Sequence, residues 1–473
     1  MPEAPYRPPG PRPIGPQLAL FRAIWRGDRD LINLLPASAY EIDVGRLGHS
    51  RRGILLINDP ATLREILTDP LDIFPKNDLM QGALAPLVGD SIFGSGGDTW
   101  RRQRRMIEPA FSHMRINRAF DAMRGAVDDL EQRLDAHVAS GEPIPLTATM
   151  SQVTADIICR TIFSRPLDSG ASREVFDAFD VFESSVANVS LRHLILSRPF
   201  SPIAQPPDVL AACERIRLAV GQLLDPKLDG TDAAADIAAD LIAARDPEDG
   251  SAFDREELID QLGVFFLAGH ETTASALTWV LFILSQRPEV VARMRDEVAA
   301  VVGDEPVSFA ASKQLPYVRN VFRETLRLYP PITFIPRVAA EDTRIAGKRV
   351  RRGTMLMVSP WTIQRHRRLW RDPDVFDPDR FLPAREADMP AGAYLPFGQG
   401  PRVCVGAAFA VIESALIIAR LVRRYDFEAL DAEQVRPVAR LTTRPEQEVL
   451  LRIRHRSADD RAARPDGEAI TQA

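Results

Sequence analysis

One long apolar segment, interrupted near its middle by a polar cluster, constrains what this chain can fold into. Between Asp254 and Pro288, apolar residues recur at helical spacing, and Pro288 supplies a stop signal. The pattern predicts a single helix of roughly thirty residues, or about 45 Å at 1.5 Å per residue. Because its flanks are largely apolar, the helix must be mostly buried. The presence of a polar cluster, GHETT at 269–273, in a buried helix therefore requires an explanation.

A membrane span, a metal site and a plain core helix are the alternatives for this segment. A membrane span is disfavoured because a glutamate and a histidine at its centre are costly in lipid. A zinc protease would need a second histidine four residues after His270, where Ala274 stands. The third alternative is a buried helix whose polar side chains satisfy one another, unless other segments assign them chemistry.

The overall composition is that of an ordinary soluble globular protein and argues against nucleic-acid binding. Of 473 residues, 45% are hydrophobic and 26% are charged. The 59 basic and 65 acidic residues leave a net charge of −6, which does not attract a polyanion. Among the basic residues, 55 are arginine and four are lysine, a bias that we attribute to a GC-rich bacterial genome.

The cysteines and the N-terminus indicate a cytoplasmic protein. Cys159, Cys213 and Cys404 show no C-x-x-C spacing, so neither a disulfide framework nor a zinc or iron–sulfur site is expected. Residues 1–40 form a Pro-rich arm that lacks both the apolar core of a signal peptide and the roughly twenty apolar residues of an anchor. Residues 456–473 form a polar tail.

Local patterns predict a mainly α protein with a small β region, an α+β arrangement in which distant segments share the sheet. Helical patterns dominate from about 98 to 330. The other predicted elements are β-like runs at 40–48, 51–59 and 343–359, a helix from about Pro60 and a last helix from about 405 to 424.

Cys404 lies just ahead of that last helix, in the stretch PFGQGPRVCVG. A thiolate there would meet the positive end of the helix dipole and free backbone N–H groups, which stabilise an anion. Gly398, Gly400 and Gly406 allow the backbone to approach a flat, bulky partner closely. A lone cysteine is more often an inert core residue, but these neighbours argue against that interpretation.

The loop follows the pattern F-x-x-G-x-R-x-C-x-G, filled by Phe397, Gly400, Arg402, Cys404 and Gly406. This pattern resembles the haem-ligand loop of the cytochrome P-450 family of haem-thiolate monooxygenases. The resemblance implies that Cys404 binds the iron of haem b. It also implies that Phe397, Gly398 and Arg402 contact the haem.

Two further segments resemble structural motifs of the same family. VRNVFRETLRLYPP carries Glu324 and Arg327, and FDPDRFLP supplies Arg380, with Asp379 where the family has glutamate. The i, i+3 spacing lets a carboxylate and a guanidinium meet on a helix, although such a pair alone is more often a surface ion pair. The resemblance implies a buried structural triad of Glu324, Arg327 and Arg380 that braces the side of the fold holding the thiolate.

Three residues resemble the family's ligands for the haem propionates. Trp100 and Arg104 lie one turn apart in GDTWRRQRRM, and Arg337 lies in TFIPRVAAEDT. The planar guanidinium fork of arginine suits a carboxylate. The resemblance therefore assigns all three to cofactor binding.

The remaining arginines near Trp100 have two interpretations. Arg101, Arg102 and Arg105 form a solvated helix face in the first. In the second, the same three arginines join RHRRLWR at 365–371 as a docking patch for an acidic electron donor.

The polar cluster of the long helix resembles the family's oxygen-binding pattern A-G-x-[DE]-T-[TS], at Ala268, Gly269, Glu271, Thr272 and Thr273. Thr272 lies four residues after Ala268, so its hydroxyl can hydrogen-bond that carbonyl and loosen the helical ladder. The resemblance implies that Ala268 and Gly269 let the helix lie against the haem. It also implies that Thr272 and Glu271 deliver protons during dioxygen activation. His270 is expected to pack, or to line the pocket.

The resemblance spans about residues 40–455 and implies one triangular, mostly helical catalytic domain at 41–455, although the length alone suggests two or three domains. Cysteinate-bound haem would insert one oxygen atom of dioxygen into the substrate, by hydroxylation or epoxidation. A monomer is expected, with electrons from a separate ferredoxin or flavodoxin and its reductase. A peroxide-driven or isomerising haem-thiolate enzyme and a non-catalytic haem sensor are the alternatives.

The substrate is expected to be a small apolar molecule such as a terpenoid, a steroid or a fatty-acid derivative. The segments around 77–95, 180–205 and 332–336 resemble the family's substrate-contacting regions and hold mostly apolar side chains. Ile332 and Phe334 are the best individual candidates for substrate contact.

Overall fold

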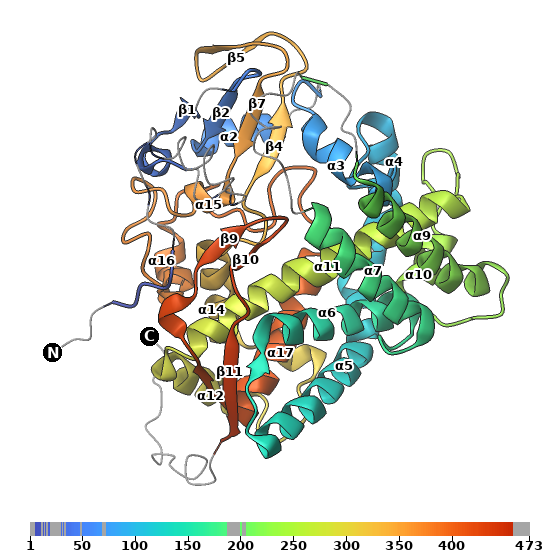
Figure 1. The fold of residues 1–473 in the computed structure, drawn as a ribbon, viewed down its shortest axis with the longest axis vertical. Coiled ribbons are helices and arrows are strands. Elements are labelled where there is room, and N and C mark those ends of the chain that lie inside the picture. Colours follow the sequence, from blue (N-terminus) through green and yellow to red (C-terminus); the bar gives the residue numbers. More distant parts are fainter. Residues whose placement is uncertain are drawn as a thin grey trace.

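The computed structural model describes residues 35–47, 50–68, 72–186, 199–200 and 205–456, together with some of the first 34 residues. Helices make up most of it (Figure 1). They are α2 (Pro60–Leu67), α3 (Asp78–Val88), α4 (Gly97–Ile107), α5 (His113–Ser140), α6 (Leu146–Phe163), α7 (Gly170–Val186), α9 (Pro207–Leu228), α10 (Ile237–Ala243), α11 (Arg255–Leu284), α12 (Pro288–Val301), α13 (Phe309–Ser312), α14 (Pro316–Leu328), α15 (Pro360–Ile363), α16 (Pro383–Glu386) and α17 (Ala407–Arg424). Within the described part of the chain, no helix combines the length and the apolar character that a membrane crossing requires.

The long helix predicted around the GHETT cluster is α11, which crosses the centre of the molecule (Figure 1). It begins after Asp254, whose side chain accepts a hydrogen bond from the N–H of Glu257, while the Glu257 side chain accepts one from the N–H of Asp254. This capping box satisfies N–H groups that the first turn leaves unpaired. Most residues from Leu258 to Leu284 are buried, which confirms the predicted core helix.

The strands form small sheets. They are β1 (Val44–Arg46), β2 (Ile54–Ile57), β3 (Ile144–Pro145), β4 (Ile335–Val338), β5 (Thr343–Ile345), β6 (Lys348–Val350), β7 (Met355–Val358), β8 (Tyr425–Ala429), β9 (Pro437–Ala439), β10 (Thr443–Pro445) and β11 (Leu450–His455). Two distant parts of the chain build the largest sheet, in the order β1-β2-β7-β4, with only β2 and β7 parallel. In Figure 1 this sheet lies at the top, above the helical bulk. The structure therefore confirms the predicted α+β class.

Helices on both sides hold α11 in place. On one side, the Thr154 hydroxyl of α6 donates to the His270 carbonyl of α11 at 3.0 Å. On the other side, Trp279 of α11 stacks on Tyr329, which follows α14, with 3.8 Å between ring centroids. Large aromatic rings contribute much of the apolar area that a core buries. These contacts fix the height and rotation of α11, and with them the position of its polar cluster.

Residues ahead of position 41 also belong to this packing. Leu35 and Ala39 are buried in the main core. The indole N–H of Trp361 donates to the hydroxyl of Tyr40 at 2.8 Å. The last residues of the Pro-rich arm are therefore part of the folded body.

Candidate active site

A cavity of about 920 Å³ lies between the middle of α11 and the loop that precedes α17. Its other walls come from α3, from residues 331–337 and from the tip of the β9–β10 hairpin. All the catalytic, cofactor-binding and substrate-binding residues predicted from the sequence line it: Trp100, Arg104, Ala268, Gly269, Glu271, Thr272, Ile332, Phe334, Arg337, Phe397, Gly398, Arg402 and Cys404. The fold thus brings distant segments to one place.

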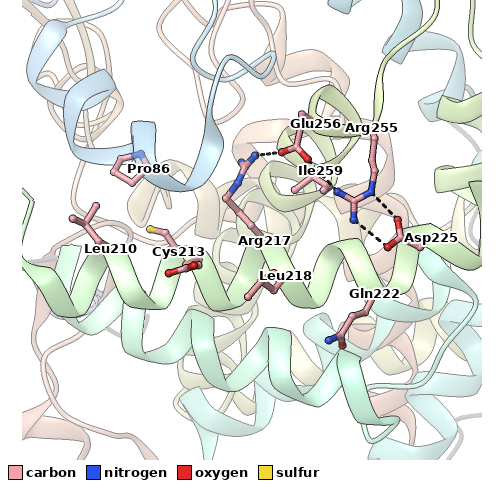
Figure 2. Close-up of a pocket in the computed structure, with 11 residues that line it drawn as sticks. Pro86, Leu210, Cys213, Arg217, Leu218, Gln222, Asp225, Arg255, Glu256 and Ile259 are labelled. Atoms are coloured by element: carbon pink, nitrogen blue, oxygen red, sulfur yellow. Dashed lines mark hydrogen bonds and ion pairs between the residues drawn. The ribbon is translucent and has the colours of Figure 1, made fainter.

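A second hollow, of about 440 Å³, lies between α9, α11 and the end of α3 (Figure 2). Most of its charged side chains pair with one another, Arg255 with Asp225 at 2.8 Å and Arg217 with Glu256 at 3.0 Å. Cys213 lies in its wall, and burial raises the pKa of that thiol to about 11. Paired charges and a protonated thiol offer little reactivity, so the larger cavity is the candidate site.

Cys404 is exposed on the cavity wall, just ahead of the N-terminus of α17. Its N–H donates to the carbonyl of Phe397 at 3.0 Å, which closes the loop on itself. Burial on its other sides raises the pKa of the Cys404 thiol, whereas the N–H of Gly406 and the charge of Arg104 act to lower it. By contrast, Cys159 is fully buried in the core, where burial raises its pKa to about 12. Cys404 alone among the three cysteines combines access to this cavity with groups that stabilise a thiolate.

Two glycines give the Cys404 loop its shape. Gly398 and Gly400 have φ angles of 76° and 79°, in the left-handed region that other residues rarely adopt. A Cβ on Gly400 would also lie 2.5 Å from the carbonyl oxygen of Leu67 at the end of α2. The loop can therefore pack against α2 and direct Cys404 into the cavity only with glycine at this position.

Cations form a second group on the cavity wall, in which Arg337 is buried and Lys76 and Arg402 are half-buried. The Arg402 guanidinium lies 4.3 Å from the centre of the Trp100 ring, and Lys76 faces Arg337 in an isolated β-bridge. Burial, followed by the charge of Arg402, lowers the pKa of Arg337 to about 10. Burial also lowers the pKa of Lys76 well below its ordinary value, with Arg402 and Arg337 adding to the effect. The charge of Arg402 therefore disfavours the charged forms of both Arg337 and Lys76.

Among the described residues, the side chains of Lys76, Arg337 and Arg402 donate hydrogen bonds to backbone carbonyls rather than to carboxylates. The Asp72 carboxylate acts to raise the pKa of Arg402, but no carboxylate in the described part of the chain acts on Lys76 or Arg337 in this way. Much of the positive charge is therefore uncompensated among the described residues, an arrangement that suits a bound anion. Lys76 was not predicted from the sequence. The only signal that could have found it is its rarity, as one of four lysines beside 55 arginines.

The polar cluster of α11 forms the opposite wall. Thr272 Oγ1 donates to the Ala268 carbonyl at 2.6 Å, which confirms the hydrogen bond predicted from the spacing. The predicted loosening of the ladder is not observed, because α11 remains helical throughout. A Cβ on Gly269 would lie 2.5 Å from Cδ1 of Ile158, so the glycine allows α6 and α11 to pack closely beside the cavity.

The two residues between Gly269 and Thr272 face different surroundings. His270 is buried, with Nε2 at 3.2 Å from the hydroxyl of Ser151 and its ring against Phe176, so it packs outside the cavity. Glu271 lines the cavity and accepts a hydrogen bond from the hydroxyl of Thr442 at 2.5 Å. A carboxylate beside a hydroxyl at the wall of an apolar cavity can hold and pass a proton.

Comparison with known proteins identifies the family. The Cytochrome P450 family model matches residues 38–452. The chain belongs to the cytochrome P450 family. The cyclooctat-9-en-7-ol 5-monooxygenase of Streptomyces melanosporofaciens is 32% identical over 412 residues, which cover 87% of each chain. The pentalenene oxygenase of Streptomyces avermitilis is 29% identical and covers 84% of this chain and 87% of its own.

The crystal structure of the cytochrome P450DA heme domain has the same fold. It superimposes with a TM-score of 0.81 at 23% identity and covers 98% of this P450 and 100% of that chain. The family and the relatives make the protein a cytochrome P450 monooxygenase, an enzyme that uses haem and dioxygen. The resemblance inferred from the motifs is therefore confirmed.

The residues of this P450 site fit haem. The sulfur of Cys404 is accessible from the cavity and suits iron. The neighbouring cations Lys76, Arg337 and Arg402 suit the two propionate carboxylates of the porphyrin. When bound to a thiolate, haem supplies the redox chemistry that activates dioxygen.

The predicted structural triad lies outside the cavity and is fully assembled. The Glu324 carboxylate accepts two hydrogen bonds from Arg327, at 2.7 and 2.8 Å, and one from Arg380 at 3.3 Å. The side chains of Glu324 and Arg327 have no solvent exposure. Arg327 also donates to the carbonyls of Gln364, Pro373 and Val375. The triad therefore joins α14 to the chain that leads toward the Cys404 loop.

Asp379, the one departure of this P450 from the family pattern, takes no part in the triad. Its carboxylate pairs with Arg293 of α12 at 2.7 Å, near the surface. The shorter side chain thus leaves the buried ion pairs intact.

The α4 arginines of the hypothesised docking patch all form salt bridges within the chain. Arg101 pairs with Asp98 at 2.7 Å and with Asp72 at 3.2 Å. Arg102 pairs with Glu257 at 2.6 Å. Arg105 makes two hydrogen bonds to Asp246, at 2.9 and 2.8 Å, and pairs with Glu248. The contacts of Arg102 and Arg105 tie α4 to the first turn of α11 and to the loop ahead of it. They indicate a structural role, because the arginine charges are already paired with carboxylates.

The RHRRLWR segment of the same hypothesis is also engaged within the protein. Arg365 is buried, with its guanidinium 3.6 Å from the centre of the Trp361 ring. Arg367 pairs with Glu41 at 2.5 Å. Arg371 is the exception, because its side chain is almost fully exposed and lies 3.8 Å from Asp372. Most other arginines of the hypothesised patch are already paired or buried within the protein.

Proposed function

We propose that this P450 inserts one atom of dioxygen into an apolar cyclic terpenoid or a molecule of similar size and polarity. The single observation that carries the proposal is the cavity itself, in which Cys404 faces the Thr272 and Glu271 wall across mostly apolar residues. Two relatives, the cyclooctat-9-en-7-ol 5-monooxygenase and the pentalenene oxygenase, support the terpenoid class. Two electrons and two protons per turnover reduce the second oxygen atom to water.

In this proposal Cys404 is the iron ligand of haem b, with Phe397, Gly398 and Gly400 shaping the loop around it. Lys76, Trp100, Arg104, Arg337 and Arg402 hold the propionates by charge-assisted hydrogen bonds. These roles rest on a sulfur accessible from the cavity and on Lys76, Arg337 and Arg402, whose side chains donate to backbone carbonyls within the described residues. Arg104, by contrast, donates to the Val403 carbonyl at 2.7 Å and also pairs with Glu108 at 3.3 Å.

On the opposite wall, Thr272 and Glu271 handle protons. Because the Thr272 hydroxyl donates its hydrogen to Ala268, its oxygen lone pairs are left to accept a hydrogen bond from the cavity side. Glu271 carries a proton between solvent and the site where dioxygen is reduced. A haem protein that only binds a gas needs no such residues, so this wall favours turnover over sensing.

Ile332 and Phe334 contact the substrate in this proposal, because both line the cavity on the segment between α14 and β4. Residues 77–95 also supply part of the cavity wall. The third predicted region, 180–205, lies largely outside the described residues.

The proposal also covers organisation and partners. One catalytic domain spans 41–455 together with the packed last residues of the Pro-rich arm, with the rest of that arm before it and the polar tail after it. The enzyme is a cytoplasmic, bacterial monomer that receives electrons from a separate ferredoxin or flavodoxin with its reductase. Support comes from the family's use of such donors and from the two Streptomyces relatives.

A substrate screen tests the proposed function. The haem-loaded protein is titrated with cyclic terpenoid hydrocarbons, steroids and fatty acids, and binding is read from the Soret band. Hits are incubated with a ferredoxin, its reductase and ¹⁸O₂. The proposal predicts a terpenoid product that carries one ¹⁸O atom. Product formed with peroxide alone, at the rate of the full system, would instead favour the peroxide-driven alternative.

Replacing Thr272 with alanine is predicted to leave haem and substrate binding intact but to divert reducing equivalents to peroxide. The hydroxyl lost is the one on the cavity wall, and positioned proton-transfer groups contribute roughly 10²-fold or more. The measurement is peroxide released per electron pair consumed.

A matched control for that variant lies two turns along the same helix. Thr278 makes the same kind of hydrogen bond, to the Ala274 carbonyl at 2.8 Å, but does not line the cavity. Thr278→Ala should therefore remain coupled. Full coupling in Thr272→Ala would remove Thr272 from the proposed mechanism.

A further inference from the structure

The β9–β10 hairpin is fastened to α11 directly beside Glu271. The Thr443 carbonyl, at the start of β10, accepts hydrogen bonds from the Ser275 hydroxyl at 2.5 Å and from the Trp279 indole at 2.9 Å. Ser275 and Trp279 lie four and eight residues after Glu271, so the three share one face of the helix. The hairpin therefore lies along the α11 face that carries the acid.

A second set of contacts fixes the same hairpin to the substrate side of the cavity. The Thr443 N–H donates to the Pro331 carbonyl at 2.9 Å, and its hydroxyl donates to the Pro330 carbonyl at 2.6 Å. The hydroxyls of Thr443 and Thr333 are 2.7 Å apart. Thr443 thus joins α11 to the segment that leads into Ile332, and it leaves the preceding residue little freedom of position.

That preceding residue is Thr442, and its hydroxyl donates to Glu271 Oε1 at 2.5 Å. Thr442 is 2% exposed and Glu271 is 9% exposed. A carboxyl group of this kind would otherwise choose among several side-chain rotamers, of which only some face the cavity. A hydrogen bond to a charged or proton-carrying group is worth more in such surroundings than in water.

We propose that Thr442 is a positioning residue, which holds the Glu271 carboxyl in the orientation from which it delivers protons. The assignment rests on the proposed function, because it presumes that Glu271 is the acid of the relay. It adds a residue from a hairpin 171 positions away in the sequence. Because Leu441 and Thr442 also line the cavity, a substrate that touches the hairpin tip would alter the orientation of the Glu271 carboxyl.

The first test detects the hydrogen bond between Thr442 and Glu271 in protein that is not turning over. Infrared spectra of the haem-loaded resting protein, free of substrate and electron donor, are recorded for wild type, Glu271→Gln, Thr442→Val and Thr442→Ser. The band lost in Glu271→Gln is the Glu271 carboxyl band. The proposal predicts that this band shifts in Thr442→Val, which keeps the shape but not the hydroxyl, and returns to the wild-type position in Thr442→Ser. An unshifted band in Thr442→Val would overturn the pairing.

The second test measures how the Thr442 hydroxyl affects the rate of proton delivery by Glu271. Haem-loaded protein, reduced beforehand with dithionite, is mixed rapidly with dioxygen and excess reduced ferredoxin, and ferredoxin oxidation is followed in H₂O and D₂O. Glu271→Gln should slow it about 100-fold and Thr442→Val about tenfold, within the range set by a positioned proton donor. Thr442→Ser should lie within about twofold of wild type, and Thr442→Val/Glu271→Gln should be no slower than Glu271→Gln.

The outcomes separate this inference from the proposed function. A wild type that consumes no electrons would overturn the function, while the infrared band still decides the pairing. A wild type that turns over, beside a Thr442→Val variant with unchanged rate and solvent isotope effect, would overturn the role of Thr442 alone. If Thr442→Val does not fold, Thr442→Ala gives the same readouts. A double variant much slower than Glu271→Gln would show that Thr442 acts other than through Glu271.

Discussion

Cys404→Ala should abolish oxygenation and leave a folded protein. Among the described residues that line the main cavity, Cys404 is the only thiol. The surrounding loop is held by backbone groups, including the hydrogen bond from the Cys404 N–H to the Phe397 carbonyl. Removing the sulfur therefore changes stability by no more than about 1 kcal/mol. It deletes the group that a haem iron would bind and that drives O–O cleavage in this family.

The measurement combines thermal unfolding with product formation from a substrate identified in the ¹⁸O₂ screen. Cys213→Ala serves as the matched control, because that thiol lies in the separate hollow at α9 and burial raises its pKa. The control should retain turnover. Oxygenation by Cys404→Ala at a rate near that of wild type would show that the cavity uses another ligand.

Glu324→Ala should destabilise the fold more than any other single replacement considered for this P450. The variant leaves Arg327 and Arg380 buried without the carboxylate that both contact. Breaking a buried pair by removing one partner typically costs about 3–5 kcal/mol, because the remaining charge stays desolvated. The loss should appear as a lower urea midpoint and as weaker retention of haem, since the triad joins α14 to the chain before the Cys404 loop.

A surface pair provides the control for this experiment. Arg349 and Asp342 are 3.5 Å apart and mostly exposed, and pairs of that kind are worth about 1 kcal/mol or less. Arg349→Leu should therefore unfold at nearly the wild-type midpoint. If Glu324→Ala unfolded there as well, the triad would be dispensable for stability.

Motifs within single segments account for most of what could be predicted from the sequence. The Cys404 loop places a sulfur, three glycines and a helix start within a dozen residues, so its geometry is largely local. The GHETT cluster fixes the positions of Glu271 and Thr272 on α11 by helical periodicity alone, and the capping residue Asp254 marks where that helix begins.

Contacts between distant segments account for what could not be predicted. Thr442 reaches Glu271 across 171 positions, through a hairpin whose strands are three residues long. Strands that short carry too little pattern to recognise, so the hairpin itself was not predicted. The same reason applies to Lys76, whose neighbours Arg337 and Arg402 come from remote parts of the chain.

Burial explains why the arginine clusters were harder to interpret than the cysteine. A run such as RHRRLWR looks like a solvated or docking surface, yet Arg365 stacks on Trp361 in the interior. Arg102 likewise pairs with Glu257, which lies beyond any local pattern. Composition records how many charges a segment carries, whereas only the fold determines which of them are already paired.

The absorption spectrum of the purified wild-type protein, reduced with dithionite and exposed to carbon monoxide, tests the central claim most directly. Ligation of haem iron by the Cys404 thiolate predicts a strongly red-shifted Soret band that is absent from Cys404→Ala. A protein that retains no haem after reconstitution, or one whose band has the position typical of histidine ligation, would contradict the assignment of Cys404 and the proposed oxygenation with it.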